Sequence, residues 1–146
     1  MTGLASPAPG DPLLQVWRGS AASLVEAVTG PAWCLRGAHM RTRRGLLEEW
    51  AAATPFPPHF GGTWDALRDA LSDLPEGGTF VILDADQLLQ EATPGEALTW
   101  LAVLRAAAGD LAPRPFRVIL QVEPSRCPGL AAGVRALLAG NPEGPN

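Results

Sequence analysis

Three aspartates follow one another at four-residue intervals in the stretch HFGGTWDALRDALSDLP, residues 59–75. Residues four apart in an α-helix lie one above the other, so Asp65, Asp69 and Asp73 are expected to share roughly one face. Carboxylates arranged in this way have three possible uses. They can form a solvated surface, provide a metal-binding or catalytic pair, or contact a positively charged partner.

The apolar residues of the same stretch predict a helix with one buried stripe. They recur at spacings of three and four: Trp64, Leu67, Leu71 and Leu74. Thr63 is the expected N-cap, and Asp65 follows it in the first turn, where the helix dipole stabilises a negative charge. A purely structural role is therefore available for Asp65.

Asp69 has no comparable structural role, because it lies beyond the first turn. It is one turn from Asp65, and like charges at this spacing cost about 0.2–0.5 kcal/mol. Arg68 could relieve the repulsion by pairing with Asp65, three residues before it, or could instead face a partner. Both positions of Arg68 stay open at the level of sequence.

Negative charge is concentrated in the middle of the chain. The 146 residues have a formal net charge of −4. Residues 60–104 contain eight acidic residues and a single arginine, Arg68, and so carry −7. A segregated acidic surface attracts basic partners by electrostatic steering. The acidic balance also argues against nucleic acid as a direct partner.

No motif of an established catalytic or cofactor-binding kind occurs. A P-loop, HExxH, GxSxG and an EF-hand DxDxDG loop are all missing from the sequence. A divalent metal held by Asp65 and Asp69 would need further oxygen ligands, and Asp84 and Asp86 would have to converge with them. We expect no catalytic residue, no metal and no cofactor.

Two smaller features of the sequence have a structural interpretation. The basic segment GAHMRTRR, residues 37–44, contains His39 and favours a solvated turn and helix start over a phosphate contact. Cys34 and Cys127 lie far apart in no metal-binding pattern, which indicates small buried residues in a reducing compartment. No apolar run is long enough for a signal peptide or a membrane span. We therefore expect a monomeric, cytoplasmic protein.

The elements that must hold the aspartate helix alternate along the chain. Apolar runs predict strands at 32–37, 79–83 and 116–122, with a further short strand possible at 13–17. Helical spacing occurs within 20–30, around Leu46 to Trp50 before the prolines from Pro55 onward, and at 63–74, 95–111 and 127–140.

This order predicts an α/β protein with a small three-stranded parallel sheet packed with helices, because parallel strands need long crossovers. We divide the single globular domain into four parts: a flexible N-terminus at 1–12, an N-terminal addition packing on the core at 13–31, the main α/β unit at 32–122, and a C-terminal helix and tail at 123–146.

The order and motifs of residues 32 to about 122 resemble the barstar family, small cytoplasmic inhibitors of barnase-type ribonucleases. In that family a Tyr-Tyr-Gly loop leads into a helix containing Asn-Leu-Asp-Ala-Leu-Trp-Asp, and the stretch HFGGTWDALRD, residues 59–69, occupies the same places. The opening strand with Arg-Gly, the helix with LLEEW and the strand FVILDADQL also follow the family order.

The resemblance implies that the loop and helix enter the active site of a basic ribonuclease or another basic toxin and place carboxylates where RNA phosphates bind. It implies Asp69 as the central anion, Asp65 as a second anion and Thr63 as a polar contact. By the same implication the ring of His59 lies over the cleft. The expected partner-binding residues are His59, Phe60, Gly61, Gly62, Thr63, Asp65, Arg68, Asp69, Asp73 and Asp84.

Three positions depart from the family pattern. Arg68 replaces the interface tryptophan, Ala106 stands at the place of an interface glutamate, and His59 replaces a tyrosine. An alternative function of a different class therefore stays open. On this alternative the protein is a non-inhibitory regulatory or scaffold module that uses its N-terminal addition to bind another protein.

Overall fold

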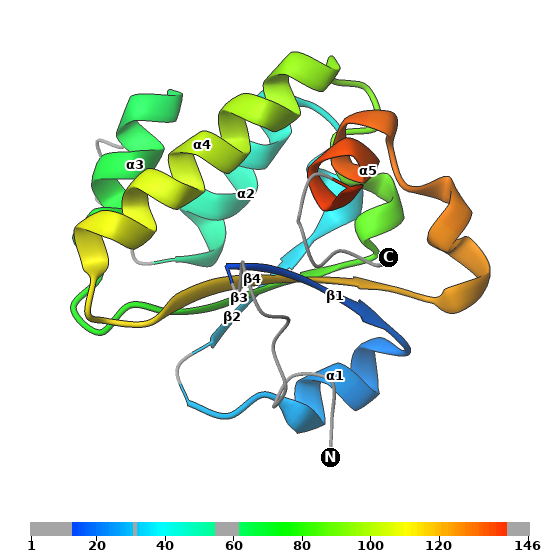
Figure 1. Ribbon diagram of the computed structural model, residues 1–146, viewed down its shortest axis with the longest axis horizontal. Coiled ribbons are helices and arrows are strands. Elements are labelled where there is room, and N and C mark those ends of the chain that lie inside the picture. Colours follow the sequence, from blue (N-terminus) through cyan, green and yellow to red (C-terminus); the bar gives the residue numbers. More distant parts are fainter. Residues whose placement is uncertain (1–12, 31, 55–61, 140–146) are drawn as a thin grey trace.

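Four parallel strands form the sheet at the centre of the protein. The computed structural model describes residues 13–30, 32–54 and 62–139 (Figure 1). The strands are β1 (Leu14–Arg18), β2 (Ala32–Arg36), β3 (Gly78–Leu83) and β4 (Phe116–Val122). Their order across the sheet is β1-β4-β3-β2, and all neighbouring pairs are parallel.

The prediction of a three-stranded sheet is wrong by one strand. The N-terminal addition contributes β1, which pairs with β4 from Leu14 opposite Val118 to Arg18 opposite Val122. β4 reads FRVILQV and is buried along most of its length. Without β1, this apolar strand would be an exposed sheet edge, which invites aggregation. The sequence analysis predicted that the addition packs on the core, and it missed that β1 extends the sheet.

Helices cover the two faces of the sheet unequally (Figure 1). Four lie on one face: α2 (Arg43–Ala53), α3 (Trp64–Ser72), α4 (Pro94–Leu111) and α5 (Ala132–Ala139). The other face carries α1 (Ala21–Ala27). Three short 3₁₀ helices follow β2, β3 and β4: η1 (Gly37–His39), η2 (Ala85–Gln87) and η3 (Pro124–Gly129). None of the helices in the described ranges is long and apolar enough to cross a membrane.

The main core lies between the sheet and the four helices and is centred on Phe80 of β3. The ring of Phe80 stacks on Trp33 with centroids 4.7 Å apart and also contacts Trp50 and Phe116. Trp50 is fully buried, as is Trp100 of α4. Trp33 and Trp64 are partly buried and pack against the same core.

A second, smaller core joins α1 to the other face of the sheet. Leu24 of α1 is completely buried against Val81 and Ile119, and Trp17 of β1 packs at its margin. The side chain of Ser20 caps α1 by accepting a hydrogen bond from the backbone N–H of Ser23. The described part of the N-terminal addition therefore completes the sheet and covers part of its second face.

The cysteines are less buried than the sequence predicted. Both are free thiols; Cys127 is partly buried and Cys34 is exposed. Cys34 lies opposite Val81 in the register of β2 and β3. The two side chains therefore point to the same face of the sheet. Val81 is buried there and Cys34, on the edge strand, is left uncovered. The prediction failed because sequence spacing does not reveal how far α1 extends across the sheet.

Candidate partner-binding site

The aspartate helix begins as the sequence predicted. Thr63 is the N-cap of α3, and its hydroxyl oxygen accepts a hydrogen bond from the backbone N–H of Ala66 at 3.1 Å. Gly62 precedes it with φ of +69°, a conformation in which glycine carries no steric penalty. Asp65 lies in the first turn, where the helix dipole favours a carboxylate.

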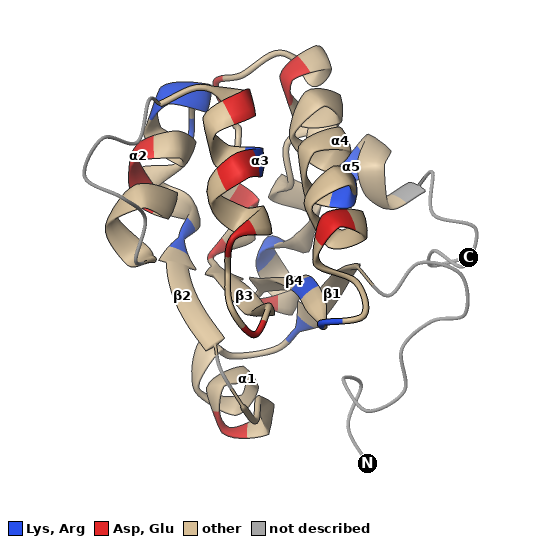
Figure 2. Ribbon diagram, turned by 90° about the vertical axis from the view of Figure 1, so that its left-hand side faces the viewer, with Lys and Arg blue, Asp and Glu red and all other residues tan. Residues whose placement is uncertain are grey.

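One face of α3 is buried and the opposite face is acidic. Leu67, Ala70 and Leu71 are buried against the main core, and Leu74 is buried just beyond the helix. The predicted apolar stripe is thus confirmed. Figure 2 shows acidic residues following one another along α3 and into the turn that leaves it.

We call the exposed carboxylates that follow α3 the acidic ridge; its members are Asp65, Asp69, Asp73 and Glu76. Within the described part of the chain, no arginine or histidine forms an ion pair with any of them. The other acids of this segment that form ion pairs are Asp84 with Arg126 at 2.9 Å, Glu91 with Arg41 at 2.8 Å and Glu96 with Arg43 at 3.5 Å. The ridge carboxylates therefore lack a direct ion pair with a described cation, and Arg68 acts on Asp69 and Asp65 only through the longer-range attraction between their charges.

The ridge is not explained by the stability of α3. Asp73 is the C-cap residue, and the last turn contains no basic residue. A negative charge at a helix C-terminus is unfavourable, and so are like charges one turn apart. Only Asp65 is placed where the helix dipole favours it. Neither the helix dipole nor the spacing along the ridge favours Asp69 and Asp73, and such departures from local stability are typical of functional sites.

Arg68 does not fold back onto Asp65 but reaches across to α4. Its Nε and Nη2 atoms lie 3.1 and 3.4 Å from the two carboxylate oxygens of Asp110. Ser72 Oγ lies 2.8 Å from Asp110 Oδ2. The hydrogen bond from Arg68, followed by that from Ser72, lowers the pKa of Asp110 below its ordinary value. The same contact with Asp110 raises the pKa of Arg68.

Asp110 was missed by the sequence analysis. It lies 42 residues from Arg68, and no local pattern connects the two. A second arginine fixes the same corner of the fold: Arg114 donates to the backbone carbonyl of Leu74 at 2.8 Å and to that of Leu111 at 3.0 Å. The end of α3 is thus tied to the end of α4 by side chains from outside the predicted motif.

Asp84 lies at the other end of β3 from the turn that contains Glu76. The turn that leaves α3 enters the amino end of β3, whereas Asp84 follows its carboxyl end. The six residues of β3 span roughly 20 Å. Asp84 has a left-handed backbone conformation with φ of 54°, and its carboxylate is paired with Arg126. Unlike the ridge carboxylates, Asp84 therefore forms a direct ion pair within the described residues.

The other expected site residues are placed as follows. Gly62 and Thr63 are exposed beside the start of α3, and Ala106 is partly buried on α4. His59, Phe60 and Gly61 lie outside the described residues.

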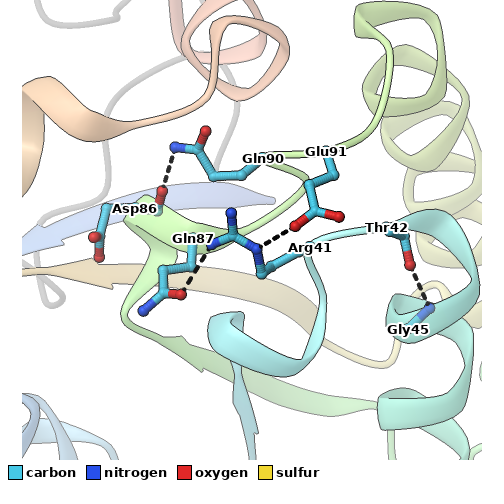
Figure 3. A network of polar contacts seen from close by, with 7 residues as sticks. All are labelled: Arg41, Thr42, Gly45, Asp86, Gln87, Gln90 and Glu91. Atoms are coloured by element: carbon cyan, nitrogen blue, oxygen red, sulfur yellow. Dashed lines mark hydrogen bonds and ion pairs between the residues drawn. The ribbon is translucent and has the colours of Figure 1, made fainter.

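The basic segment at 37–44 is compensated by acidic residues. Arg41 contacts Glu91 and, at 3.1 Å, the side-chain oxygen of Gln87 (Figure 3). Arg44 pairs with Glu48 at 3.1 Å, and His39 lies 3.1 Å from Glu49. The segment forms η1 and the start of α2, which confirms the turn and helix start. Its cations are occupied and do not form a free anion site.

The ridge carboxylates do not converge with others around a metal position. Among the described residues, no group of three or more histidine, cysteine, aspartate or glutamate side chains could hold a metal ion. What the arrangement offers chemically is a row of exposed carboxylate acceptors along one helix.

Comparison with known proteins assigns the α/β unit to a family. The family model of barstar, described as barnase inhibitor, matches residues 31–122. No curated protein matches the chain. Among solved structures, a Walker-type ATPase of Pyrococcus abyssi is similar over 75% of this chain and 40% of its own, with 16% sequence identity and a TM-score of 0.46. The chain thus spans less than half of that ATPase, and a likeness at this level carries no argument about ATP.

Proposed function

Because this chain belongs to the barstar family, we propose that it is a protein inhibitor of a basic ribonuclease of the barnase type. The inhibitor binds with the loop and helix at residues 59–73 and blocks the active site of the nuclease. The partner is a toxic ribonuclease or a related basic toxin, and the complex contains one copy of each protein. The inhibitor itself is not an enzyme.

The observation that carries this proposal is the acidic ridge. Its carboxylates are exposed along α3 and the turn that follows it, and no ion pair joins them to a described cation, whereas Asp84, Glu91 and Glu96 are paired. A ribonuclease holds RNA phosphates with arginine and lysine side chains. Those groups also bind carboxylate oxygens, and arginine does so with two parallel hydrogen bonds. The ridge therefore matches the cations of an empty nuclease site.

Within the contact, Asp69 is the central anion and Asp65 the second. Asp69 lies in the middle of α3 with its neighbours Leu67 and Ala70 buried, so the helix supports it rigidly. Thr63 contributes a polar contact beside its capping role. Asp73 extends the row of charge, and Asp84 joins only if a partner cation replaces Arg126.

A regulatory or scaffold role for the N-terminal addition is less well supported. In the described residues of the addition, β1 pairs with β4 and Leu24 is buried in the second core. These segments are used by the fold itself. The acidic ridge is the described surface with unused binding capacity.

The test is inhibition of RNA cleavage by barnase-type ribonucleases. The protein is titrated into each nuclease at about 0.02 M and about 0.5 M salt, where screening lengths differ several-fold. We expect inhibition that weakens with salt. Absence of both inhibition and binding at micromolar concentration, for all nucleases tested and for basic proteins captured from the source cells, would refute the proposal.

A further inference from the structure

Arg68 is a cation between two anions of the acidic ridge, and its position determines how much of the ridge charge reaches a partner. Asp65 is three residues before it and Asp69 is adjacent. Residues three apart on a helix are neighbours, and an acid that precedes a base at this spacing forms a stabilising pair. A contact with Asp65 is thus sterically available to Arg68.

The structure shows a different contact. The guanidinium group binds both carboxylate oxygens of Asp110 with Nε and Nη2. This two-atom arrangement is stronger and more directional than a single ion contact. Ser72 Oγ lies 2.8 Å from Asp110 Oδ2 and equally far from the carbonyl oxygen of Arg68. Its one hydroxyl proton can be donated to Asp110, which holds the carboxylate in place.

We propose that Asp110 is a positioning residue of the partner-binding site, which keeps Arg68 in the seam between α3 and α4 so that Asp65 and Asp69 stay free of a direct ion pair with this arginine. The effect on binding rests on the proposed function. The position of the Arg68 side chain is a property of the free protein and can be tested without a partner.

The proposal predicts that two substitutions compensate each other. Asp110→Asn removes one negative charge and also releases Arg68 toward Asp65, so two effects weaken the attraction for a basic partner. Adding Arg68→Gln removes the released cation and restores the charge of the ridge. If Asp110 acted only through its own charge, Arg68→Gln would raise the affinity by the same factor with and without Asp110. Repositioning of Arg68 instead predicts a larger gain from Arg68→Gln in the Asp110→Asn background than in wild type.

The first experiment uses the free protein. NMR cross-relaxation between the Arg68 side chain and the β-protons of Asp65 is measured in wild type, Asp110→Asn and Asp110→Glu. We expect contacts to Asp65 only in Asp110→Asn, with the Nε–H of Arg68 exchanging faster with water. Asp110→Glu should retain the wild-type pattern. An unchanged Arg68 position in folded Asp110→Asn overturns the inference.

The second experiment measures affinity for a barnase-type ribonuclease at low salt. We expect Asp110→Asn to weaken binding about three- to tenfold, and the double variant with Arg68→Gln to return to within about twofold of wild type. Glu26→Gln is the matched control, because it removes one exposed charge from α1 on the other face of the sheet. A double variant as weak as Asp110→Asn contradicts the proposal.

The outcomes separate this inference from the proposed function. If wild type binds none of the nucleases, the proposed function fails and the NMR experiment still decides the position of Arg68. If Asp110→Asn does not fold, Arg68→Gln alone remains informative: it should bind the nuclease at least as tightly as wild type, and weaker binding overturns the inference.

Discussion

The side chains of Arg68 and Asp110 meet at 3.1 Å in the seam between α3 and α4, although the residues are 42 positions apart in the chain. Arg68 stands where the barstar pattern has a tryptophan, and a free arginine there would reduce the negative potential of the helix. The pair with Asp110 gives this cation an acidic neighbour outside the ridge. The arginine that departs from the family pattern is thus paired with Asp110, a residue outside the pattern.

Replacing Asp69 by alanine should abolish tight inhibition. The partner cation that faces Asp69 would be left buried and unpaired, which costs about 2–5 kcal/mol of binding, a general range established in part on barnase and barstar themselves. Calorimetric titration of each variant into free nuclease, of the kind that the wild-type protein inhibits, measures the loss of binding free energy. Glu26→Gln serves as the control for net charge, and an equal loss in both variants would contradict a specific role of Asp69.

Replacing Asp73 by asparagine should stabilise the protein while weakening binding. The substitution removes a negative charge from the C-terminus of α3, where the helix dipole disfavours it by about 0.3–1 kcal/mol. Asp65→Asn is the matched comparison, because it removes a favourable charge from the first turn and should lower stability. Urea unfolding of the two variants measures whether each substitution raises or lowers the free energy of unfolding. If both substitutions changed the free energy of unfolding in the same direction, the helix dipole would not account for the effect of these charges.

Stability should fall in acid partly through Asp110. Hydrogen bonds from Arg68 and Ser72 hold its pKa below the ordinary value in the folded state. The unfolded chain therefore takes up this proton at a higher pH, near 4. The contribution is complete above about pH 4 and is lost as the pH falls through the folded-state pKa. Urea unfolding between about pH 6 and 2 should show a shallower decline in Asp110→Asn than in wild type, and parallel curves would exclude the contribution.

Shortening Leu24 to alanine should destabilise the fold without changing the ridge. Leu24 is completely buried in the second core, and such a truncation costs about 2–5 kcal/mol. Denaturant unfolding measures this cost, and nuclease inhibition under native conditions should stay at the wild-type level. Val25→Ala, at an exposed neighbour on α1, is the control and should be nearly neutral. A neutral Leu24→Ala would argue against α1 as part of the folded core.

Cys34 should react with a thiol reagent in the native protein faster than Cys127. Cys34 is exposed on the edge strand, whereas Cys127 is partly buried. A reagent reaches an exposed thiol more readily than a partly buried one. Cys34→Ser and Cys127→Ser variants assign the two phases of labelling. Equal slow rates for both thiols would contradict the exposure of Cys34.

The sequence determined the regular elements because their signals are local. The stripe of Leu67 and Leu71 fixed which side of α3 faces the core, and the hydroxyl of Thr63 fixed where the helix starts. The apolar run at 116–122 predicted β4 with both of its bounds. The outward direction of Asp65, Asp69 and Asp73 follows from the same periodicity, so the acidic face could be derived without coordinates.

Tertiary structure decided everything that depends on contacts distant in the chain. The pairing of β1 with β4 joins segments about a hundred residues apart, and β1 is too short to indicate a partner. The sequence also left the contact of the Arg68 side chain undetermined, because Asp65 and a partner were both possible. Asp110 comes close to Arg68 only when α4 packs beside α3. Local periodicity fixes the face on which a charge lies, but the charges that surround it are set by which elements pack together.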